Sequence, residues 1–333
     1  MAVLSFAAAI NSALDVALGA DPDVFLLGED ISDPGGGVYN ITKGLSTKYG
    51  EHRVRDTPIS ESAIIGAATG AALAGKRPVA EIMIMDFLGV CLDQLANHAA
   101  KLRYMTGGQA HVPLVVRMSA GAGVQFGAQH SELLEAWLVH TPGLKVVMPS
   151  TPAAAKGLLL SAIFDDDPVV FIEPTLLYFG AAKEEVPDGD VRIPLGQARI
   201  AREGSHVTLI SYGLHVHTCL TAAAQLHENG LEAEVIDLQT LEPLDAETVL
   251  TSVKKTQRAV VVHEAVGRGG FGAELSSQIH EALFNELVEP VRRVTGPNTP
   301  VPFAKPLETA FVPTAKDVAA AATQLCGTKA SWV

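Results

Sequence analysis

Two glutamates stand where predicted secondary-structure elements meet. Glu29 directly follows the apolar run Val24–Leu27, and Glu61 ends the motif DTPISE in front of a helix of small residues. Open α/β sheets bind ligands just beyond the carboxyl ends of their strands. Apolar surroundings raise the pKa of a carboxyl group, so both side chains suit acid–base chemistry. Helix capping by Ser60 or Glu61 is the structural alternative.

An aromatic residue and a histidine follow two further apolar runs. Phe87 comes just after the run Val79–Ile84 and offers a flat face to a planar ring, with a place in the core as its alternative. His130 ends the Gly/Ala-rich stretch Gly121–His130, whose small residues let the backbone approach a ligand closely. None of these four side chains identifies a site by itself, but their order along the chain does.

Two glycine motifs imitate nucleotide-binding loops. The stretch Gly70–Lys76 matches part of a phosphate-binding loop, but Arg77 replaces the Ser or Thr that would hold magnesium, which favours a helix end at Gly75. The motif G-x-G-x-x-G at Gly267–Gly272 has dinucleotide-binding spacing, yet no acidic residue follows the next strand. We predict close backbone packing there, with a nicotinamide-dependent oxidoreductase as the alternative function.

The cysteines and the paired histidines do not form metal or redox motifs. Cys91, Cys219 and Cys326 are far apart and odd in number, which predicts buried thiols in a reducing cytoplasm. His215 and His217 have no third ligand nearby in the sequence, so we predict solvated histidines rather than a zinc site.

The composition predicts a globular, acidic protein. The chain has 333 residues, 48% of them apolar and 18% charged, which excludes a disordered protein and predicts two domains. The 24 basic and 37 acidic residues give a net charge of −13, which argues against nucleic acid or an anionic membrane surface as a partner. The longest uncharged stretches are shorter than the roughly 20 residues that span a bilayer, so we expect a soluble cytoplasmic protein without a secretory signal.

Short apolar runs alternate with Ala-rich helical stretches along the whole chain. This alternation predicts two α/β domains with mostly parallel sheets. A polar, helix-poor connector at 183–203 separates a first domain at 1–182 from a second at 204–333. The predicted strands are Val24–Leu27, Val79–Ile84, Leu114–Met118, Val146–Met148 and Val169–Ile172, then His206–Ser211, Ala233–Leu238, Ala259–His263 and Pro290–Val294.

In the order of its motifs the chain resembles the beta subunit of the decarboxylating component of 2-oxo acid dehydrogenase complexes. This transketolase-like thiamine-diphosphate family also includes acetoin dehydrogenases. The matching stretches cover nearly the whole chain and include LLGEDI, GVYNITKGL, DTPISESAIIGAATGAALAGKRPVAEI, MDFLGVCLDQLANHAAKLRYMTGGQ, GAQHSELLEAW, HTPGLKVVMPSTPAAAKGLL, DDDPVVF, HEAVGRGGFGAEL and TGPNTPVPFAKPLE. The resemblance implies a pyrimidine-binding thiamine-diphosphate fold followed by a transketolase C-terminal-like domain.

The resemblance assigns a role to each candidate side chain. Glu61 is expected to hydrogen-bond a ring nitrogen of the cofactor's aminopyrimidine, which favours the imino tautomer that deprotonates the thiazolium. Phe87 is expected to pack on the aminopyrimidine. His130 is expected near the reacting carbon, where it stabilises an oxyanion or passes protons to the lipoyl acceptor. Glu29 is expected to line a polar path between paired active sites.

The resemblance also implies ions and partners. A structural potassium ion would be held mostly by backbone carbonyls, with a solvated acidic turn as the alternative because this chain has Asp where family members often have Asn. The chain lacks the G-D-G motif and later Asn that bind magnesium and the cofactor diphosphate, so an alpha subunit must supply that half of the site in an α2β2 heterotetramer. The positions that match the potassium site are Leu114, Ala162, Ile163, Asp165 and Asp167.

The expected activity is thiamine-diphosphate-dependent decarboxylation of a 2-oxo acid such as pyruvate, or cleavage of acetoin. Reductive acylation of a lipoyl group follows, on an acyltransferase core that the acidic second domain would dock. The stretches DFLGVCLDQ and TPVPF are closer to pyruvate and acetoin enzymes than to branched-chain ones. The alternatives are a stand-alone acyloin or acyl-transfer enzyme of a biosynthetic pathway and a catalytically silent scaffold.

Overall fold

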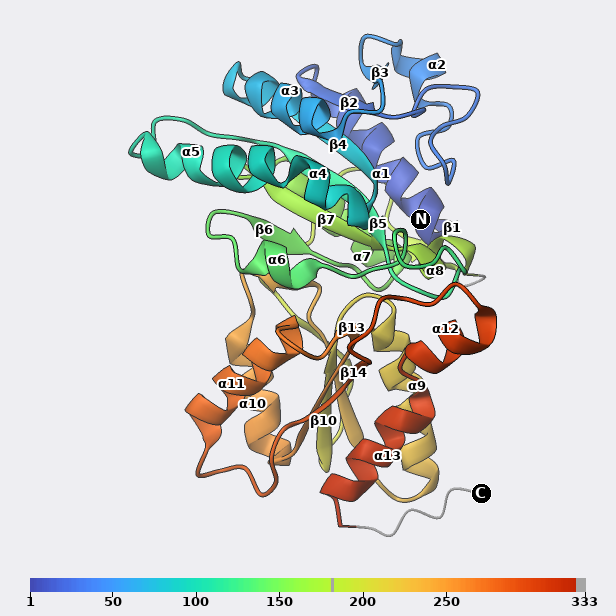
Figure 1. Ribbon diagram of the computed structural model, residues 1–333, viewed down its shortest axis with the longest axis vertical. Helices are drawn as coiled ribbons and strands as arrows, with labels where there is room; N and C mark the ends of the chain where they lie inside the picture. The colour runs from blue at the N-terminus through green and yellow to red at the C-terminus, as the bar shows by residue number, and fades with distance from the viewer. Residues whose placement is uncertain (181–182, 328–333) are drawn as a thin grey trace. The chain divides into compact units, whose positions relative to one another are not determined.

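The computed structural model describes residues 1–180 and 183–327 (Figure 1). Its internal contacts divide the chain into two compact units. The first unit comprises Met1–Gly121 and Trp137–Leu195, and the second comprises Ala122–Ala136 and Gly196–Val333. The segment Ala122–Ala136, which carries His130, therefore lies within the first unit in sequence but belongs to the second by its contacts.

The first unit is built on a parallel sheet with the strand order β6–β7–β5–β4–β2–β3. Its strands are buried on both sides and β-branched, as parallel strands between two helical layers must be. Five of them correspond to the predicted apolar runs, and the short β3 was not predicted. The strands are β2 (Val24–Gly28), β3 (Val54–Asp56), β4 (Arg77–Ile84), β5 (Val115–Ala120), β6 (Lys145–Val147) and β7 (Val169–Pro174).

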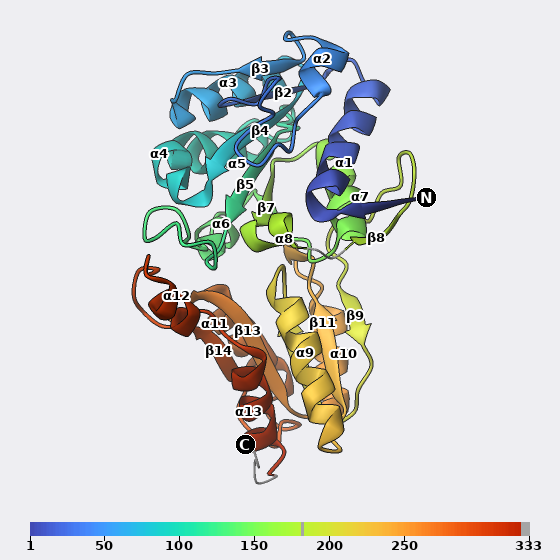
Figure 2. The same cartoon turned by 90° about the vertical axis from the view of Figure 1, so that its right-hand side faces the viewer.

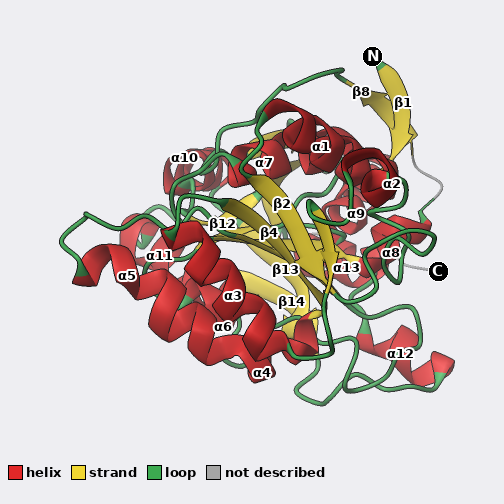
Figure 3. Ribbon diagram, turned by 90° about the horizontal axis from the view of Figure 1, so that it is seen from above, coloured by secondary structure: helices red, strands yellow, loops and turns green. Residues whose placement is uncertain are grey.

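Helices cover both faces of this sheet (Figure 3). On one face α1 packs against α7, and Leu14 and Leu159 meet Phe171 of β7 in the core. On the other face α3 packs against a long helical run that starts with α4 and ends with α5. The helices of the first unit are α1 (Phe6–Ala20), α2 (Leu45–Tyr49), α3 (Glu61–Leu73), α4 (Leu88–Leu92), the π-helical η2 (Asp93–Ala99), α5 (Ala100–Met105), α7 (Pro152–Ile163) and α8 (Thr175–Phe179), and α6 (Glu135–Val139) spans the boundary between the units.

A buried charge cluster joins three central strands of the first unit. The guanidinium of Arg117 on β5 donates hydrogen bonds to both carboxylate oxygens of Glu173 on β7, at 2.6 and 2.8 Å. It also donates to Glu81 on β4 at 2.7 Å, and the hydroxyl of Tyr178 donates to Glu173. Because Arg117 and Glu173 are almost fully buried, each charge is compensated by the others rather than by water.

Two strands lie within 183–203, the segment we predict to be a connector. β8 (Lys183–Val186) forms an antiparallel ribbon with β1 (Ala2–Ser5). β9 (Arg199–Arg202) pairs antiparallel with β11 at the edge of the second sheet (Figure 2).

The second unit has a five-stranded sheet in the order β14–β13–β10–β11–β9, parallel except for β9. The four predicted strands are present. α9 packs with α13, and α10 packs with α11. The elements are β10 (Val207–Ser211), α9 (His215–Glu228), β11 (Ala233–Asp237), β12 (Thr240–Glu242), α10 (Ala246–Thr256), β13 (Ala259–Val266), α11 (Phe271–Leu283), β14 (Arg292–Gly296), α12 (Lys305–Phe311) and α13 (Ala315–Leu325).

The predicted fold class is confirmed: both units are α/β with mostly parallel sheets. The predicted helix end at Gly75 is also present, since α3 ends at Leu73 and Gly75 has a φ of +87°. Over residues 1–180 and 183–327, no helix combines the length and the apolar character that a membrane crossing requires.

Candidate active site

Glu61 is the first residue of α3, at the carboxyl end of the sheet. The side chain is 8% exposed, and within the described part of the chain no group donates a hydrogen bond to it. Ser60 occupies the N-cap position but makes no side-chain cap, so Ser60 does not act as the helix cap. A mostly buried carboxylate of this kind takes its hydrogen bonds from water or from a ligand.

Glu29 lies at the carboxyl end of β2 and shares its surroundings with Glu61. It is also 8% exposed. Burial raises the pKa of Glu29, and the negative charges of Glu61, Asp30 and Glu81 raise it further. The structure therefore brings the two predicted glutamates of the first unit close enough to repel each other, and the expected rise in pKa is confirmed for Glu29.

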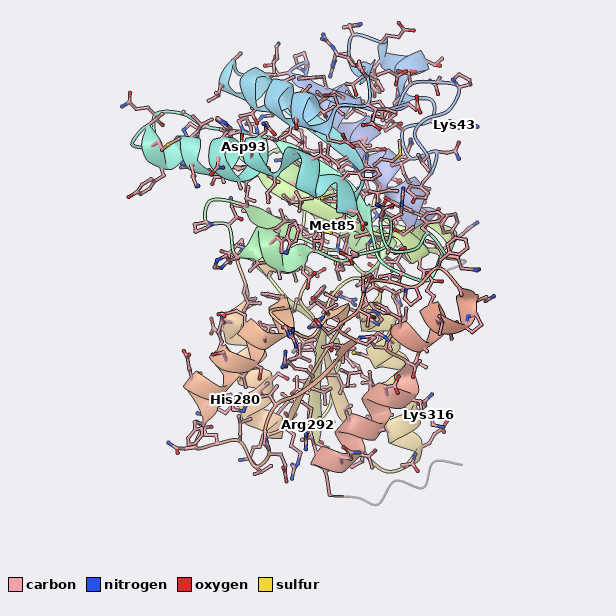
Figure 4. The ribbon with its side chains drawn as sticks, viewed as in Figure 1. Lys43, Met85, Asp93, His280, Arg292 and Lys316 are labelled. Carbon is pink, nitrogen blue, oxygen red and sulfur yellow. The ribbon has the colours of Figure 1, made fainter. Side chains whose placement is uncertain are left out.

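Phe87 ends a 3-10 turn, η1 (Met85–Phe87), at the carboxyl end of β4 (Figure 4 labels Met85). Its ring is half-buried, so it is not enclosed in the core. Cys91 lies one turn further along and is buried; burial, reinforced by the charge of Glu61, raises its pKa to about 12. This thiol is protonated at neutral pH and is not a nucleophile.

His130 lies in the second unit, where its ring is half-buried and its backbone N–H donates to the carbonyl of Gly127 at 3.2 Å. A pocket of about 320 Å³ opens beside it in the same unit. The pocket is lined by residues 131–134, by the end of β13, by the segment after β14 and by Phe311. The placement of His130 against Glu61 stays a prediction.

The second unit contains a buried cluster of titratable groups that sequence reasoning missed. The hydroxyl of Tyr212 donates to Glu135 at 2.8 Å, and His215 contacts Glu264 at 3.3 Å. Burial raises the pKa of Glu135 to about 7, and the nearby charge of Glu264 adds to this rise. His215 is 3% exposed, so the prediction of a solvated histidine is wrong there, because β13 presents Glu264 to its ring.

The G-x-G-x-x-G motif has the packing role predicted for it. Gly267 follows β13, and Gly272 is the second residue of α11. A Cβ atom at Gly272 would lie 2.4 Å from Nε2 of His263, and one at Gly267 would lie 2.7 Å from Oγ1 of Thr295. Gly272 therefore allows α11 to pack directly on β13, and Gly267 allows the turn after β13 to approach β14.

The positions predicted to hold potassium lie around the turn between α7 and β7. The Arg77 guanidinium donates to the carbonyls of Asp165, at 3.0 Å, and Ile163, at 3.4 Å. The amino group of Lys145 lies 2.7 Å from both carboxylate oxygens of Asp165, and Arg103 pairs with Asp167. The acidic turn is therefore paired rather than solvated.

The remaining predicted donors, Leu114 and Ala162, already accept backbone hydrogen bonds through their carbonyls. Each carbonyl retains a second lone pair, so the oxygen donors still suit a hard cation. No group of three or more His, Cys, Asp or Glu side chains with a metal-binding arrangement occurs among the described residues. The potassium site stays a prediction.

Comparison with known families matches almost the whole chain. Residues 2–180 match the pyrimidine binding domain of transketolase, and residues 196–318 match the transketolase C-terminal domain. Among solved structures, a split-gene transketolase described as an inactive beta4 tetramer has a TM-score of 0.76 and 25% identity, covering 99% of this chain and 100% of that one.

Three curated relatives show similarity along nearly their full length. The beta subunit of acetoin:2,6-dichlorophenolindophenol oxidoreductase from Cupriavidus necator is 50% identical, covering 96% of both chains. The mitochondrial pyruvate dehydrogenase E1 component subunit beta-2 from Oryza sativa is 45% identical, over 96% of this chain and 85% of the relative. The 2-oxoisovalerate dehydrogenase beta subunit from Pseudomonas aeruginosa is 45% identical, over 94% of this chain and 92% of the relative.

Proposed function

This chain belongs to the transketolase-like family of thiamine-diphosphate-dependent 2-oxo acid and acetoin dehydrogenase beta subunits, and we propose that it forms one half of such an enzyme's active site. In this proposal it is an oxidoreductase subunit that works with an alpha subunit and a lipoyl acceptor. The observation that carries the proposal is the buried carboxylate of Glu61, which accepts no hydrogen bond from any residue that the structure describes and lies near Glu29 at the carboxyl ends of the strands.

The residues of the first unit fit an aminopyrimidine ring. Glu61 offers a buried acceptor that needs a donor, and the half-buried Phe87 offers an aromatic face. When bound, thiamine diphosphate supplies the nucleophilic carbon and the electron sink for breaking a bond next to a carbonyl. Glu61 holds a proton at the ring nitrogen, and Glu29, with its raised pKa, holds a proton nearby. His130 donates to developing negative charge at the substrate oxygen.

An alpha subunit completes the site in this proposal. The chain has no G-D-G motif with a later Asn, so magnesium and the cofactor diphosphate would be bound by the partner in an α2β2 assembly. The relatives are all beta subunits by name, which supports such a partner. The acyltransferase core is proposed as the next partner, and the three free cysteines support a reducing cytoplasm as the compartment.

Acetoin is the first substrate to test. The acetoin-linked relative is 50% identical, against 45% for the pyruvate and 2-oxoisovalerate relatives. Cleavage of the bond between the carbonyl and carbinol carbons would release acetaldehyde. The acetyl group would pass to one sulfur of the lipoyl disulfide, which takes up the two electrons as the S–S bond breaks.

The test is an assay of the chain co-expressed with an alpha subunit. We expect thiamine-diphosphate-dependent reduction of 2,6-dichlorophenolindophenol with acetoin, and slower or no reduction with pyruvate or 3-methyl-2-oxobutanoate. Glu61→Ala should lower the rate at least about 100-fold. The control is Glu247→Ala, which removes an exposed glutamate from the first turn of α10. A Glu61→Ala complex with the wild-type rate would refute the proposal.

The potassium site is proposed with its own measurement. Replacing potassium by choline in the buffer should lower the melting temperature of the complex if the carbonyl oxygens around residues 162–165 bind the ion. An unchanged melting temperature across potassium concentrations would contradict the site and leave Arg77 as the side-chain donor to the carbonyls of Ile163 and Asp165.

A further inference from the structure

We propose that Glu308 is a positioning residue that holds the loop carrying His130 in its working conformation. We call residues 122–136 the histidine loop. The inference rests on the proposed function, because that function gives His130 its role. Glu308 lies in the stretch TGPNTPVPFAKPLE, which resembles the family. The sequence alone assigns no role to Glu308.

The carboxylate of Glu308 is buried against the histidine loop. The side chain is 3% exposed and lies in α12. Its Oε1 accepts hydrogen bonds from the backbone N–H groups of Gly123, at 2.7 Å, and Gln125, at 3.0 Å. Its Oε2 also accepts from Gln125, at 3.2 Å. Over the part of the chain that the structure describes, Glu308 forms no ion pair with Lys, Arg or His, so the loop amides stabilise its charge.

The backbone of the loop is shaped to receive an anion. Gly123, Gln125 and Gly127 have φ angles of +110°, +60° and +76°, so every second residue is in the left-handed region. Such alternation turns successive N–H groups toward one side and forms an anion-binding concavity. Gln125 is strained there because it has a Cβ, and strain of this kind persists where the surroundings enforce it.

The turn that ends in His130 depends on this anchored segment. The N–H of His130 donates to the carbonyl of Gly127, and a Cβ atom at Gly127 would lie 3.5 Å from the side chain of Phe303, in the same stretch as Glu308. Two other buried carboxylates hold the ends of the loop: Glu264 accepts from the N–H of Ala122 at 3.2 Å, and Glu135 accepts from Tyr212. Glu308 is thus the anchor between the fixed start of the loop and the histidine.

The alternative is that Glu308 only stabilises α12. A positioning role predicts that the loss of Glu308 lowers kcat only through His130. A purely structural role predicts that the two substitutions lower kcat independently, so that their effects on the activation free energy add. A double-mutant cycle separates the two, because residues that act as a unit show strongly non-additive effects.

The experiment compares heterotetramers formed with wild-type chain, Glu308→Ala, Glu308→Gln, His130→Ala and the double variant His130→Ala with Glu308→Ala. The readouts are kcat and KM for the active substrate, and backbone hydrogen exchange over residues 122–136. The control is Glu234→Gln, which changes a buried carboxylate on β11 of the same unit that accepts from the N–H of Gly204 at 3.2 Å and pairs with Lys255, away from the histidine loop.

We expect Glu308→Ala to lower kcat about 100-fold, since displacement of a reacting group by about 1 Å has that effect. Glu308→Gln retains one acceptor oxygen, so its kcat should be about tenfold higher than that of the alanine variant. Hydrogen exchange of the loop should accelerate in both, KM should change little, and Glu234→Gln should match wild type in kcat and loop exchange. The double variant should be no slower than His130→Ala alone.

Two results separate this inference from the proposed function. The positioning role would be overturned, and the function left intact, if His130→Ala slows the complex while Glu308→Ala leaves it fully active. The same conclusion would follow if the double variant lowers kcat by the product of the two single losses. A His130→Ala complex with the wild-type rate would remove the role of the histidine and this inference with it. If Glu308→Ala does not assemble, the glutamine variant and its exchange rates decide.

Discussion

Glu29 and Glu61 are both buried at the carboxyl end of the sheet. Burial raises the pKa of Glu29, and the charges of Glu61, Asp30 and Glu81 raise it further. A carboxyl group with a raised pKa keeps its proton closer to neutral pH and can pass it on. In the proposed function Glu61, at the start of α3, accepts a hydrogen bond from the cofactor.

These residues could be located from the sequence because each directly follows a predicted strand or precedes a predicted helix. Glu135 and His215 could not. Each is buried by a partner distant in the chain, Tyr212 for Glu135 and Glu264 for His215. The sequence feature that could have indicated this buried cluster is the polar pair His263 and Glu264 inside an otherwise apolar strand. Buried polar side chains require hydrogen-bond partners.

The pKa of Glu135 makes the stability of the second unit depend on pH. In the unfolded chain this carboxyl group titrates near 4.5, whereas burial raises its pKa to about 7 in the folded chain. As pH rises from 4.5 to 7 the unfolded chain loses the proton first, so the free energy of unfolding falls, by roughly 3 kcal/mol in all. Below pH 4.5 the group is neutral in both states and has no such effect.

Glu135→Gln should therefore raise the free energy of unfolding at pH 8 by up to roughly 3 kcal/mol and change it little at pH 4.5. The amide oxygen can still accept from the Tyr212 hydroxyl. Urea unfolding at the two pH values measures the effect, with the exposed Glu247→Gln as the control. Equal changes at both pH values would show that the pKa of Glu135 is not raised in the folded chain.

At the scale of elements, a buried ion cluster fixes the central strands that position the site. Arg117 is 2% exposed, and its positive charge compensates the negative charges of Glu81 on one neighbouring strand and Glu173 on the other. Arg117→Leu leaves two buried carboxylates without a cation, so we expect a loss of about 3 to 5 kcal/mol in the free energy of unfolding. Lys254→Gln, which breaks the exposed pair with Glu286, should change it by less than about 1 kcal/mol. Denaturant titration of both variants tests the contrast, and equal losses would contradict it.

The packing of α11 on β13 makes a second prediction at this scale. Gly272→Ala places a methyl group against the buried ring of His263, so overpacking should cost about 1 to 3 kcal/mol. Adding His263→Ala removes the obstructing ring, and the two changes together should cost less than their sum. Thermal unfolding of the single and double variants gives the comparison. Strict additivity would mean that the glycine has another role, such as the nucleotide binding that its motif imitates.

Long apolar runs identified most strands, while short or polar strands were missed. β3 is three residues long and β8 reads Lys-Glu-Glu-Val, so neither has the apolar periodicity that predicts a strand. Their pairing comes from neighbours distant in the sequence, β2 for β3 and β1 for β8. The helices at Phe6–Ala20 and Phe271–Leu283 differ in this respect, because each has a periodic apolar face that spans several turns.

At the scale of the whole molecule, the division into units differs from the order of the chain. The histidine loop packs with the second unit because the amides of Ala122, Gly123 and Gln125 bind carboxylates at positions 264 and 308. These contacts span more than 140 residues, so no local pattern could have predicted them. The predicted glutamates belong to the first unit and His130 to the second.

The activation of thiamine diphosphate by Glu61 is tested most directly by the exchange of the thiazolium C2 proton with deuterium in the assembled complex with an alpha subunit. The measurement is made at saturating cofactor, so weaker binding does not interfere. The account predicts rapid exchange in the wild-type complex and exchange at least about 100-fold slower in Glu61→Ala, with Glu247→Ala unchanged. Equal exchange rates in the wild-type and Glu61→Ala complexes would contradict it.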